Sequence, residues 1–287
     1  SRQWDAPPLT PATWKDDLDF EKWEEMVNIA KESAKSDEIG KVVFARTRKV
    51  SFEELPELTT VFSRLNDAYP ATFRFYFEPR PGLVFMGATP ELLVRTKGRS
   101  LETVALAGSA PRSNDEALNA QYSAALLASK KDQREHAIVI EDIVEGLTPL
   151  CSKIDYAKEP QLRFLPNIQH LETPIKATLK EAGIFAPVQA LHPTPALAGQ
   201  PRPRAMEMIR EHEPKPRGGY GAPVGWISPS GDGEMAVAIR SAVFRKKEGY
   251  LYAGGGLLAA SDPAKEWQET IMKFRPMMDA LGLEEKR

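Results

Sequence analysis

The sequence predicts an α+β protein in which antiparallel strands are interspersed with amphipathic helices. Short alternating apolar segments follow one another across turns at residues 79–82, 97–99, 230–233 and 246–249, as antiparallel hairpins do. Longer segments between them have apolar residues at helical spacing. No GxGxxG or GxxxxGK[ST] motif stands where a strand enters a helix, so nucleotide-dependent chemistry is disfavoured.

The elements follow from these patterns in chain order. Residues 1–19 contain three prolines and little periodicity, so they are predicted to be a lead-in or linker, and residues 20–287 one domain. Helices are expected at residues 20–36, 55–65, 114–148, 201–212 and 263–281. Strands are expected at 41–46, 72–77, 83–87, 92–95 and 100–107, forming an antiparallel meander, and again within 160–177 and 219–258.

Charge and composition exclude several kinds of partner. The 287 residues carry 38 Lys and Arg against 40 Asp and Glu, a net charge of -2 without long runs of either sign. Nucleic acid and anionic membranes are therefore disfavoured partners. No uninterrupted apolar segment approaches about eighteen residues and no signal peptide is evident, so we expect a soluble protein. The single cysteine, Cys151, excludes an internal disulfide and favours a reducing, cytoplasmic setting.

Two helical segments carry acidic residues on one face. Glu266, Glu269 and Lys273 are spaced i, i+3 and i+7, shortly after three consecutive glycines at 254–256. Glycines let the main chain approach a ligand closely, and a carboxylate pair can hold a hard cation. Asp132 and Glu135 repeat the i, i+3 spacing. Each pair taken alone is more often a solvated helix face.

Two further residues have the chemistry of an acid and a base. Glu91 enters an apolar strand from a tight turn, and a buried carboxyl group would hold its proton near neutral pH. Lys41 opens an apolar strand, where a shielded lysine could lose its proton. The alternative for Lys41 is a strand-edge gatekeeper. His170 and His192 lack metal-pair spacing, and His136 is predicted to be a core residue.

The order of these features resembles the chorismate-utilising enzymes, a family that includes isochorismate, salicylate, anthranilate and aminodeoxychorismate synthases. The resemblance extends from Lys41 to the C-terminus. The matching segments are KVVFAR (41–46), GATPEL (87–92), AGS (107–109), KDQREH (131–136), HPTPA (192–196), GYGAPVG (219–225), and AGGG (253–256) with SDPAKEWQET (261–270). Seven matches in one order are very improbable by chance.

The resemblance implies a reaction and a Mg²⁺ cofactor. By it, Lys41 is the base that activates water for attack at ring carbon C2 of chorismate, and Glu91 is the acid that protonates the departing C4 hydroxyl. Glu135 and Glu269 would be the Mg²⁺ ligands, with Glu266 and Asp132 holding the ion through waters. These oxygen donors suit magnesium.

The resemblance also implies the residues that bind substrate. Tyr220, Arg240, Lys273 and the main chain at Gly254 and Gly256 would hold the enolpyruvyl carboxylate, for which arginine is well suited. The ring would be lined by a second set of residues: Gly108, Ser109, His170, Ala196 and Leu197. Residues 20–287 would then be the chorismate-binding catalytic domain, built as two packed antiparallel sheets with helices outside.

Three positions indicate which family member this is. Lys41 stands where the ammonia-using anthranilate and aminodeoxychorismate synthases have no lysine base, so water is the expected nucleophile. Ala107 stands where adduct-forming aminodeoxychorismate synthases have lysine. Ala196 stands where salicylate synthases tend to have threonine. The resemblance therefore favours an isochorismate synthase serving menaquinone or siderophore synthesis, and a salicylate synthase that releases pyruvate is the nearest alternative.

The remaining expectations concern partner proteins and how much of the family's usual length this sequence covers. An alternative of another class is a non-catalytic chorismate-binding subunit that partners a glutamine amidotransferase, and Lys41 argues against it. We expect a monomer without an obligatory amidotransferase subunit. Family members usually have a further N-terminal region that completes the sheet, and the resemblance implies that this sequence lacks it.

Overall fold

Two antiparallel sheets organise residues 11–285, the part of the chain that the computed structural model describes. The first has seven strands in the order β1-β2-β14-β13-β4-β3, with β10 also beside β2. Its strands are β1 (Ala12–Asp16), β2 (Lys41–Phe52), β3 (Phe73–Arg80), β4 (Leu83–Thr89), β10 (Gly199–Gln200), β13 (Ser241–Arg245) and β14 (Glu248–Leu257).

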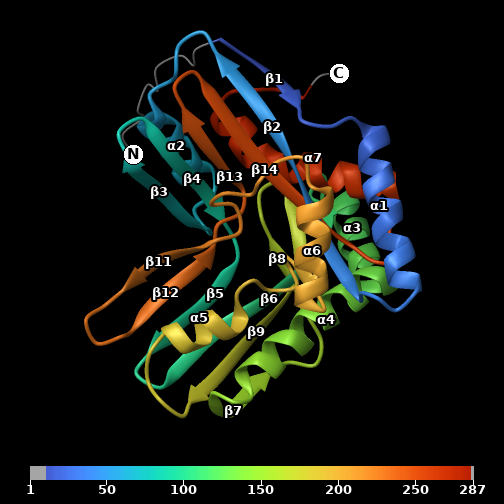
Figure 1. Ribbon diagram of the computed structural model, residues 1–287, viewed down its shortest axis with the longest axis vertical. Helices are drawn as coiled ribbons and strands as arrows, with labels where there is room; N and C mark the ends of the chain where they lie inside the picture. The colour runs from blue at the N-terminus through green and yellow to red at the C-terminus, as the bar shows by residue number, and fades with distance from the viewer. Residues whose placement is uncertain (1–10, 286–287) are drawn as a thin grey trace.

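The second sheet also has seven strands, in the order β11-β12-β5-β6-β9-β7, with β8 also beside β9. Figure 1 shows it below the first sheet. Its strands are β5 (Leu92–Lys97), β6 (Ser100–Pro111), β7 (Cys151–Tyr156), β8 (Gln161–Phe164), β9 (Ile168–Leu179), β11 (Pro223–Ile227) and β12 (Gly233–Val237). The α+β class with two antiparallel sheets is confirmed.

Seven helices in residues 11–285 cover these sheets. The helices α2 and α7 pack on the first sheet, α3 and α4 pack on the second, and α6 packs on β2 (Figure 1). Their bounds are α1 (Phe20–Lys35), α2 (Leu58–Ala68), α3 (Glu116–Ala128), α4 (Lys130–Leu147), α5 (Phe185–Leu191), α6 (Arg202–His212) and α7 (Pro263–Ala280).

Each sheet buries its own apolar cluster against its helices. Val61 of α2 and Phe274 of α7 pack with Phe244 of the first sheet. Val139 and Ile143 of α4 pack with strands of the second sheet. Because both helix sets are held by apolar faces, the charged positions on α4 and α7 are carried on rigid elements.

The prediction for residues 1–19 is corrected where the structure describes them. Ala12–Asp16 forms strand β1, paired with β2, and residues 1–10 lie outside the described range. Asp16 pairs with the buried guanidinium groups of Arg46 and Arg48. A strand stabilised by partners about thirty residues away has no strong local signal.

The predicted meander is also wrong. The β3–β4 and β5–β6 hairpins form, but β4 and β5 belong to different sheets. The long helix expected at 114–148 is two helices, because Ser129 has extended backbone and its hydroxyl caps α4 by accepting from the Asp132 amide. The elements β7, α5 and β10 were not predicted.

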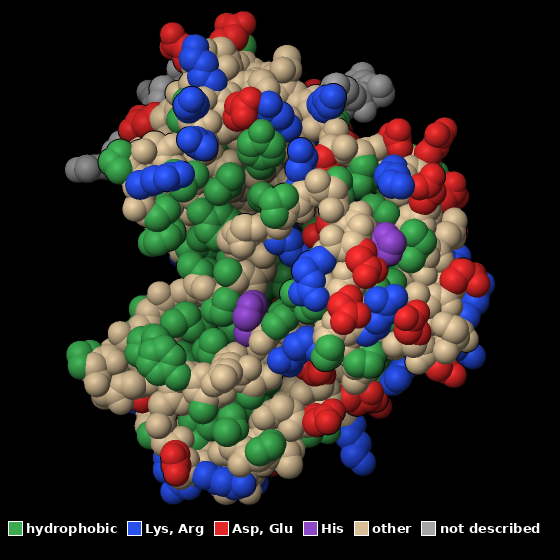
Figure 2. Space-filling view, in the orientation of Figure 1, with side chains coloured by type: hydrophobic (Ala, Val, Ile, Leu, Met, Phe, Trp, Pro, Cys, Tyr) green, Lys and Arg blue, Asp and Glu red, His purple; other side chains and the backbone are tan. Residues whose placement is uncertain are grey.

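An apolar hollow separates β3 from the β11–β12 hairpin, as Figure 2 shows on the left of the molecule. Its volume is about 520 Å³ and its lining includes Phe73, Phe75, Phe77, Val224 and Trp226. Within residues 11–285, no helix is long and apolar enough to cross a membrane.

Candidate active site

A small buried cavity of about 40 Å³ lies where the two sheets meet. Strands β2 and β14 of the first sheet contribute to its lining, and β6 and β9 contribute from the second. Fourteen of the sixteen predicted site residues line it: Lys41, Glu91, Gly108, Ser109, Glu135, His170, Ala196, Leu197, Tyr220, Arg240, Gly254, Gly256, Glu269 and Lys273. The fold thus brings together residues more than 200 positions apart.

The other two predicted residues lie next to this cavity. Asp132 and Glu266 line an outer cavity of about 490 Å³, which shares Ser109 and Glu269 with the inner one. The outer cavity therefore adjoins the inner one on the side of the α4 and α7 carboxylates.

Lys41 is buried at the start of β2 and forms an ion pair with Glu135. The Lys41 Nζ lies 2.9 Å from the Glu135 Oε1, and the Lys41 side chain is 1% exposed. Because β2 is paired at Lys41 with Gln200 of β10 and at Val42 also with β14, the strand-edge gatekeeper interpretation of Lys41 is excluded. Burial raises the pKa of Glu135, but the ammonium groups of Lys41 and Lys131 outweigh burial and lower it.

Glu91 has the properties predicted for an acid. It lies in the tight connection between β4 and β5, and it is buried. Burial raises the pKa of Glu91 to about 7, against the opposing effect of Lys41 and Arg240. At neutral pH a substantial fraction of Glu91 is therefore protonated and able to donate.

A hydrogen-bonded chain links Arg240, His170 and the main chain at Gly108. The Arg240 Nη2 donates to the His170 Nε2 at 3.0 Å. The His170 Nδ1 must then carry the ring proton, and it lies 3.1 Å from the Gly108 carbonyl oxygen and 3.0 Å from the Ser109 hydroxyl. Burial, with Arg240 and Lys273 nearby, keeps the pKa of His170 well below its ordinary value.

Two residues of this hydrogen-bonded network, Arg240 and Gly108, have unusual backbone geometry. Arg240 has a φ of 52°, which is rare for a side chain of this size. Gly108 has a φ of 74° at an irregularity in the β6–β9 pairing, where a Cβ atom would lie 3.1 Å from the Asp132 Cβ. The backbone thus turns both the guanidinium and the Gly108 carbonyl toward the cavity residue His170.

Tyr220, Gly254 and Lys273 form another part of the lining. Lys273 donates from Nζ to the Gly254 carbonyl at 2.7 Å and pairs with the Glu269 Oε1 at 2.5 Å. A Cβ atom at Gly254 would lie 2.8 Å from the Tyr220 hydroxyl oxygen, so glycine is required there. Burial raises the pKa of Tyr220 to about 12, and its hydroxyl therefore remains a donor.

A lysine that the sequence analysis left without a role lies among the acidic residues. The Lys131 Nζ is 3.0 Å from the Glu266 Oε1, 3.2 Å from the Glu135 Oε2 and 3.8 Å from the Asp132 Oδ1. Burial lowers the pKa of Lys131, but these carboxylates and Glu269 raise it well above its ordinary value. The i, i+4 spacing of Lys131 and Glu135 was the available signal.

The solvated-face interpretation does not hold for either acidic helix. Glu135, Glu266 and Glu269 are all buried, which for carboxylates requires partners. Burial raises the pKa of Glu266 to about 7, with Glu269 adding to the rise and Lys131 opposing it. Burial raises the pKa of Glu269 as well, but Lys273 and Lys131 outweigh it and lower that pKa.

These carboxylates fit magnesium by donor chemistry. They provide only oxygen ligands, and the Glu266 Oε2 is buried without a hydrogen-bond partner. In residues 11–285, however, no three His, Cys, Asp or Glu side chains converge closely enough to hold a metal ion. Lys131 occupies the space among them, so the ligand roles of Glu135 and Glu269 stay predictions.

Gly256 leads to a direct test of the Lys41–Glu135 geometry. A Cβ atom at Gly256 would lie 2.1 Å from the Glu135 Oε1 and 2.6 Å from the Lys41 Cε. Gly256→Ala is therefore expected to displace this pair and lower kcat/KM by about 100-fold, as about 1 Å of misplacement can. Gly255→Ala is the matched control, because its Cβ atom would meet only the Glu266 Oε2, at 3.5 Å. Steady-state kinetics of both variants measure the difference. Equal losses of kcat/KM in Gly256→Ala and Gly255→Ala would contradict this geometry.

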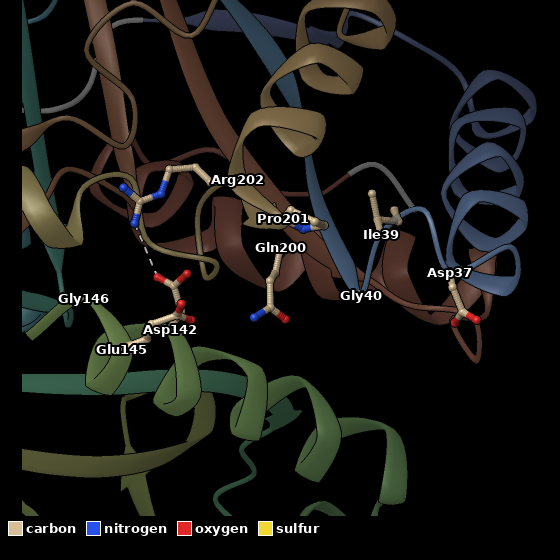
Figure 3. A pocket seen from close by; sticks show the side chains of 9 residues that line it. All are labelled: Asp37, Ile39, Gly40, Asp142, Glu145, Gly146, Gln200, Pro201 and Arg202. Atoms are coloured by element: carbon tan, nitrogen blue, oxygen red, sulfur yellow. Dashed lines mark hydrogen bonds and ion pairs between the residues drawn. The ribbon is translucent and has the colours of Figure 1, made fainter. Parts of the chain in front are cut away.

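A larger cavity lies elsewhere and has no comparable chemistry. It measures about 770 Å³ and lies between α4, the start of β2 and the start of α6, where Figure 3 shows Asp142 and Arg202 pointing toward each other. Their closest atoms are 3.5 Å apart, and Arg202 also donates to the carbonyls of Ala190 and His192. These contacts join the start of α6 to α4 and to the end of α5, which is a structural role.

Three residues in the inner lining were not predicted. Leu106, Ala107 and Ile239 line the inner cavity beside the predicted residues. Leu106 and Ala107 are apolar residues of β6, and Ile239 is an apolar residue of the connection between β12 and β13, so no local hydropathy pattern distinguishes them from core. His136 is buried, with its Nε2 2.8 Å from the Thr173 hydroxyl, and is a core residue as predicted.

Comparison with known proteins decides the family. A family model described as chorismate binding enzyme matches residues 2–282. This chain belongs to the chorismate-binding enzyme family. The structures that resemble it support the same assignment.

Several curated members of the chorismate-binding enzyme family are similar in sequence. The salicylate biosynthesis isochorismate synthase of Pseudomonas aeruginosa is 41% identical over 263 residues, which cover 91% of this chain and 55% of that protein. Isochorismate synthase MenF of Bacillus subtilis is 37% identical, covering 94% of this chain and 58% of that protein. Isochorismate synthase EntC of Escherichia coli K12 is 36% identical, covering 91% of this chain and 67% of that protein. The chain thus spans between about half and two thirds of these relatives.

Solved structures of family members have the same fold. DhbC from Bacillus anthracis superposes with a TM-score of 0.91 at 33% identity, covering 96% of this chain and 76% of that one. The menaquinone-specific isochorismate synthase MenF from Escherichia coli superposes with a TM-score of 0.87 at 31% identity, covering 96% of this chain and 64% of that one. Anthranilate synthase component I from Streptococcus pneumoniae, at 24% identity, gives 0.81 and supports the fold alone.

Proposed function

We propose that this chain is an isochorismate synthase, which converts chorismate to isochorismate with Mg²⁺ as cofactor. The observation that carries the proposal is that Lys41 and Glu91, a base and an acid, line one buried cavity together with the cationic groups Arg240 and Lys273. The named relatives that it resembles at 36–41% identity are isochorismate synthases.

The proposed reaction exchanges one water for another. Lys41, as a free amine, takes a proton from water as that water attacks ring carbon C2. Both conjugated ring double bonds shift by one position, from C1=C2 to C1=C6 and from C5=C6 to C4=C5, and the C4 hydroxyl leaves as water after taking a proton from Glu91. Chorismate's hydroxyl leaves poorly unless protonated and water attacks poorly unless deprotonated, so each residue removes one difficulty. Proton exchange with solvent then restores Lys41 and Glu91.

The remaining residues position the substrate. Arg240 and Lys273 supply positive charge for the enolpyruvyl carboxylate of chorismate, and burial with these two cations nearby keeps His170 neutral. Lys41 shares its carboxylate partner, Glu135, with Lys131. A base role for Lys41 requires that Glu135 be engaged by another cation.

The cofactor assignment is part of the proposal. Glu135 and Glu269 would hold Mg²⁺, with Glu266 and Asp132 acting through waters. When bound, the ion would neutralise the ring carboxylate of the substrate. Donor chemistry and the unpaired Glu266 Oε2 support this assignment.

Replacing Glu269 tests the metal assignment. Glu269→Gln removes the negative charge of one proposed Mg²⁺ ligand. It is expected to weaken Mg²⁺ binding by about tenfold or more, which is the loss typical when a residue that supports a metal site is replaced. Isothermal titration with Mg²⁺ measures the change. Glu172→Gln, at a residue that lies in β9 outside both cavities, is the control. Equal affinity in wild type and Glu269→Gln would contradict the assignment.

A salicylate synthase is the second candidate from the same residues. It would eliminate pyruvate after forming isochorismate, so an assay of pyruvate alongside chorismate consumption separates the two. Ala196, which lines the inner cavity, favours stopping at isochorismate. The pathway served, menaquinone or siderophore synthesis, stays a prediction, as do a cytoplasmic setting and a monomer without an amidotransferase subunit.

A further inference from the structure

Lys131 stands between the outer cavity and the acidic residues beside the inner one. It lines the outer cavity together with Asp132, Glu266 and Glu269, and Glu269 also lines the inner cavity. The inner cavity, at about 40 Å³, is far smaller than the roughly 300–1,000 Å³ of usual small-molecule sites. Some side chain near this junction must move before a substrate can be held.

The contacts of Lys131 are those of a counter-ion. Its ammonium group lies 3.0 Å from Glu266 and 3.2 Å from Glu135, so it bridges α4 and α7. Its side chain is 19% exposed, more than the 7% of Glu135 and the 4% of Glu266. Lys131 is thus the member of the cluster nearest to solvent, with the outer cavity available to receive it.

Resting on the Mg²⁺ site proposed above, we infer that Lys131 is a positioning residue that competes with the divalent cation for Glu135 and Glu266. A divalent cation bound at Glu135 and Glu266 and the Lys131 ammonium group held by the same two carboxylates would repel each other. Cation binding therefore requires Lys131 to swing into the outer cavity. This movement opens the space between the two cavities and leaves Glu135 to the cation.

Removing the Lys131 charge tests the inference. Lys131→Met keeps the length of the aliphatic side chain and removes the competitor. It is expected to bind Mg²⁺ about tenfold more tightly or better, which is about 1.4 kcal/mol. Isothermal titration of chelator-treated protein with Mg²⁺ alone measures this. Lys131→Arg, which keeps the charge, should restore the wild-type affinity, and Lys265→Met, in the outer cavity, should leave it unchanged.

A second measurement uses the unaltered protein and does not depend on the folding of a variant. Reductive methylation followed by mass spectrometry reports the accessibility of each lysine. Mg²⁺ should increase methylation of Lys131 relative to Lys153, whose side chain is 69% exposed. The expected change is an increase at Lys131 alone among the cavity lysines.

The outcomes separate this inference from the proposed reaction. Tighter Mg²⁺ binding by Lys131→Met and greater methylation of Lys131 with Mg²⁺ support it. Equal or weaker binding by Lys131→Met, or unchanged methylation, overturns it while leaving the metal site in place. Failure of the wild type to bind Mg²⁺ overturns both this inference and the proposed metal site. No readout involves chorismate, so failure of the proposed reaction alone leaves the inference standing.

Discussion

Glu91→Gln is expected to lower turnover strongly and, at alkaline pH, to make the protein more stable. Glutamine has the size of glutamate but cannot donate the proton that the leaving hydroxyl requires. A general acid contributes about 10²- to 10⁴-fold to a rate, so kcat should fall by that amount. Glu102→Gln, at a half-buried residue that pairs with Arg95 and lines neither cavity of the site, is the control and should retain wild-type kinetics.

The stability gain follows from the raised pKa of Glu91. Burial raises this pKa from 4.5 to about 7. At pH values between these two, the folded state therefore holds a proton that the unfolded state has already released. The carboxylate therefore costs stability as pH rises from about 5 to about 7, and the full cost persists above. Glu91→Gln should raise the free energy of unfolding at pH 8 by on the order of 1–3 kcal/mol.

Denaturant unfolding at pH 5 and pH 8 measures this difference. The gain should be small at pH 5, where the glutamate is mostly protonated in both states. An equal gain at both pH values would mean that the cost is steric and not due to ionisation. Wild-type turnover in Glu91→Gln would remove Glu91 from the mechanism.

Lys41→Met is expected to lower kcat by about 10²- to 10⁴-fold with the fold preserved. The fold should survive because Glu135 keeps Lys131 as a partner and methionine fills the same buried space. Lys41→Arg should not restore activity, since a guanidinium group cannot be deprotonated in a protein. Circular dichroism and thermal unfolding check the fold, and chorismate consumption gives the rate.

The control for Lys41 lies on the same strand. Lys49 is also in β2, but its side chain is 41% exposed and paired with Glu248. Lys49→Met should therefore retain activity. Recovery of the rate in Lys41→Arg would show that charge, not proton transfer, is what Lys41 supplies, and would contradict its role as a base.

The acidic and basic residues have local patterns in the sequence, but their assignment to one site came from the family resemblance. The i, i+3 pairs on α4 and α7 can be read from helix geometry, and the buried states of Lys41 and Glu91 follow from apolar neighbours. Glycines 254 and 256 were expected where a ligand approaches the main chain. In the structure, their missing Cβ atoms leave room for Tyr220 and for the Lys41–Glu135 pair.

What the sequence could not supply depends on distant contacts. Strand β1 is held by pairing with β2 and by Asp16 beside Arg46 and Arg48, so residues 12–16 alone gave no strand signal. The division of β4 and β5 between two sheets depends on their pairing with β13 and β12. The position of Lys131 depends on the approach of α7 to α4, which no spacing within either helix encodes.

The central claim is that Mg²⁺-dependent water exchange on chorismate takes place between Lys41 and Glu91. The most direct test incubates the protein with chorismate, with and without Mg²⁺, and identifies the products by chromatography while assaying pyruvate. The account predicts isochorismate without pyruvate, formed only when Mg²⁺ is present. Salicylate with pyruvate, equal conversion without Mg²⁺, or no consumption of chorismate would contradict it.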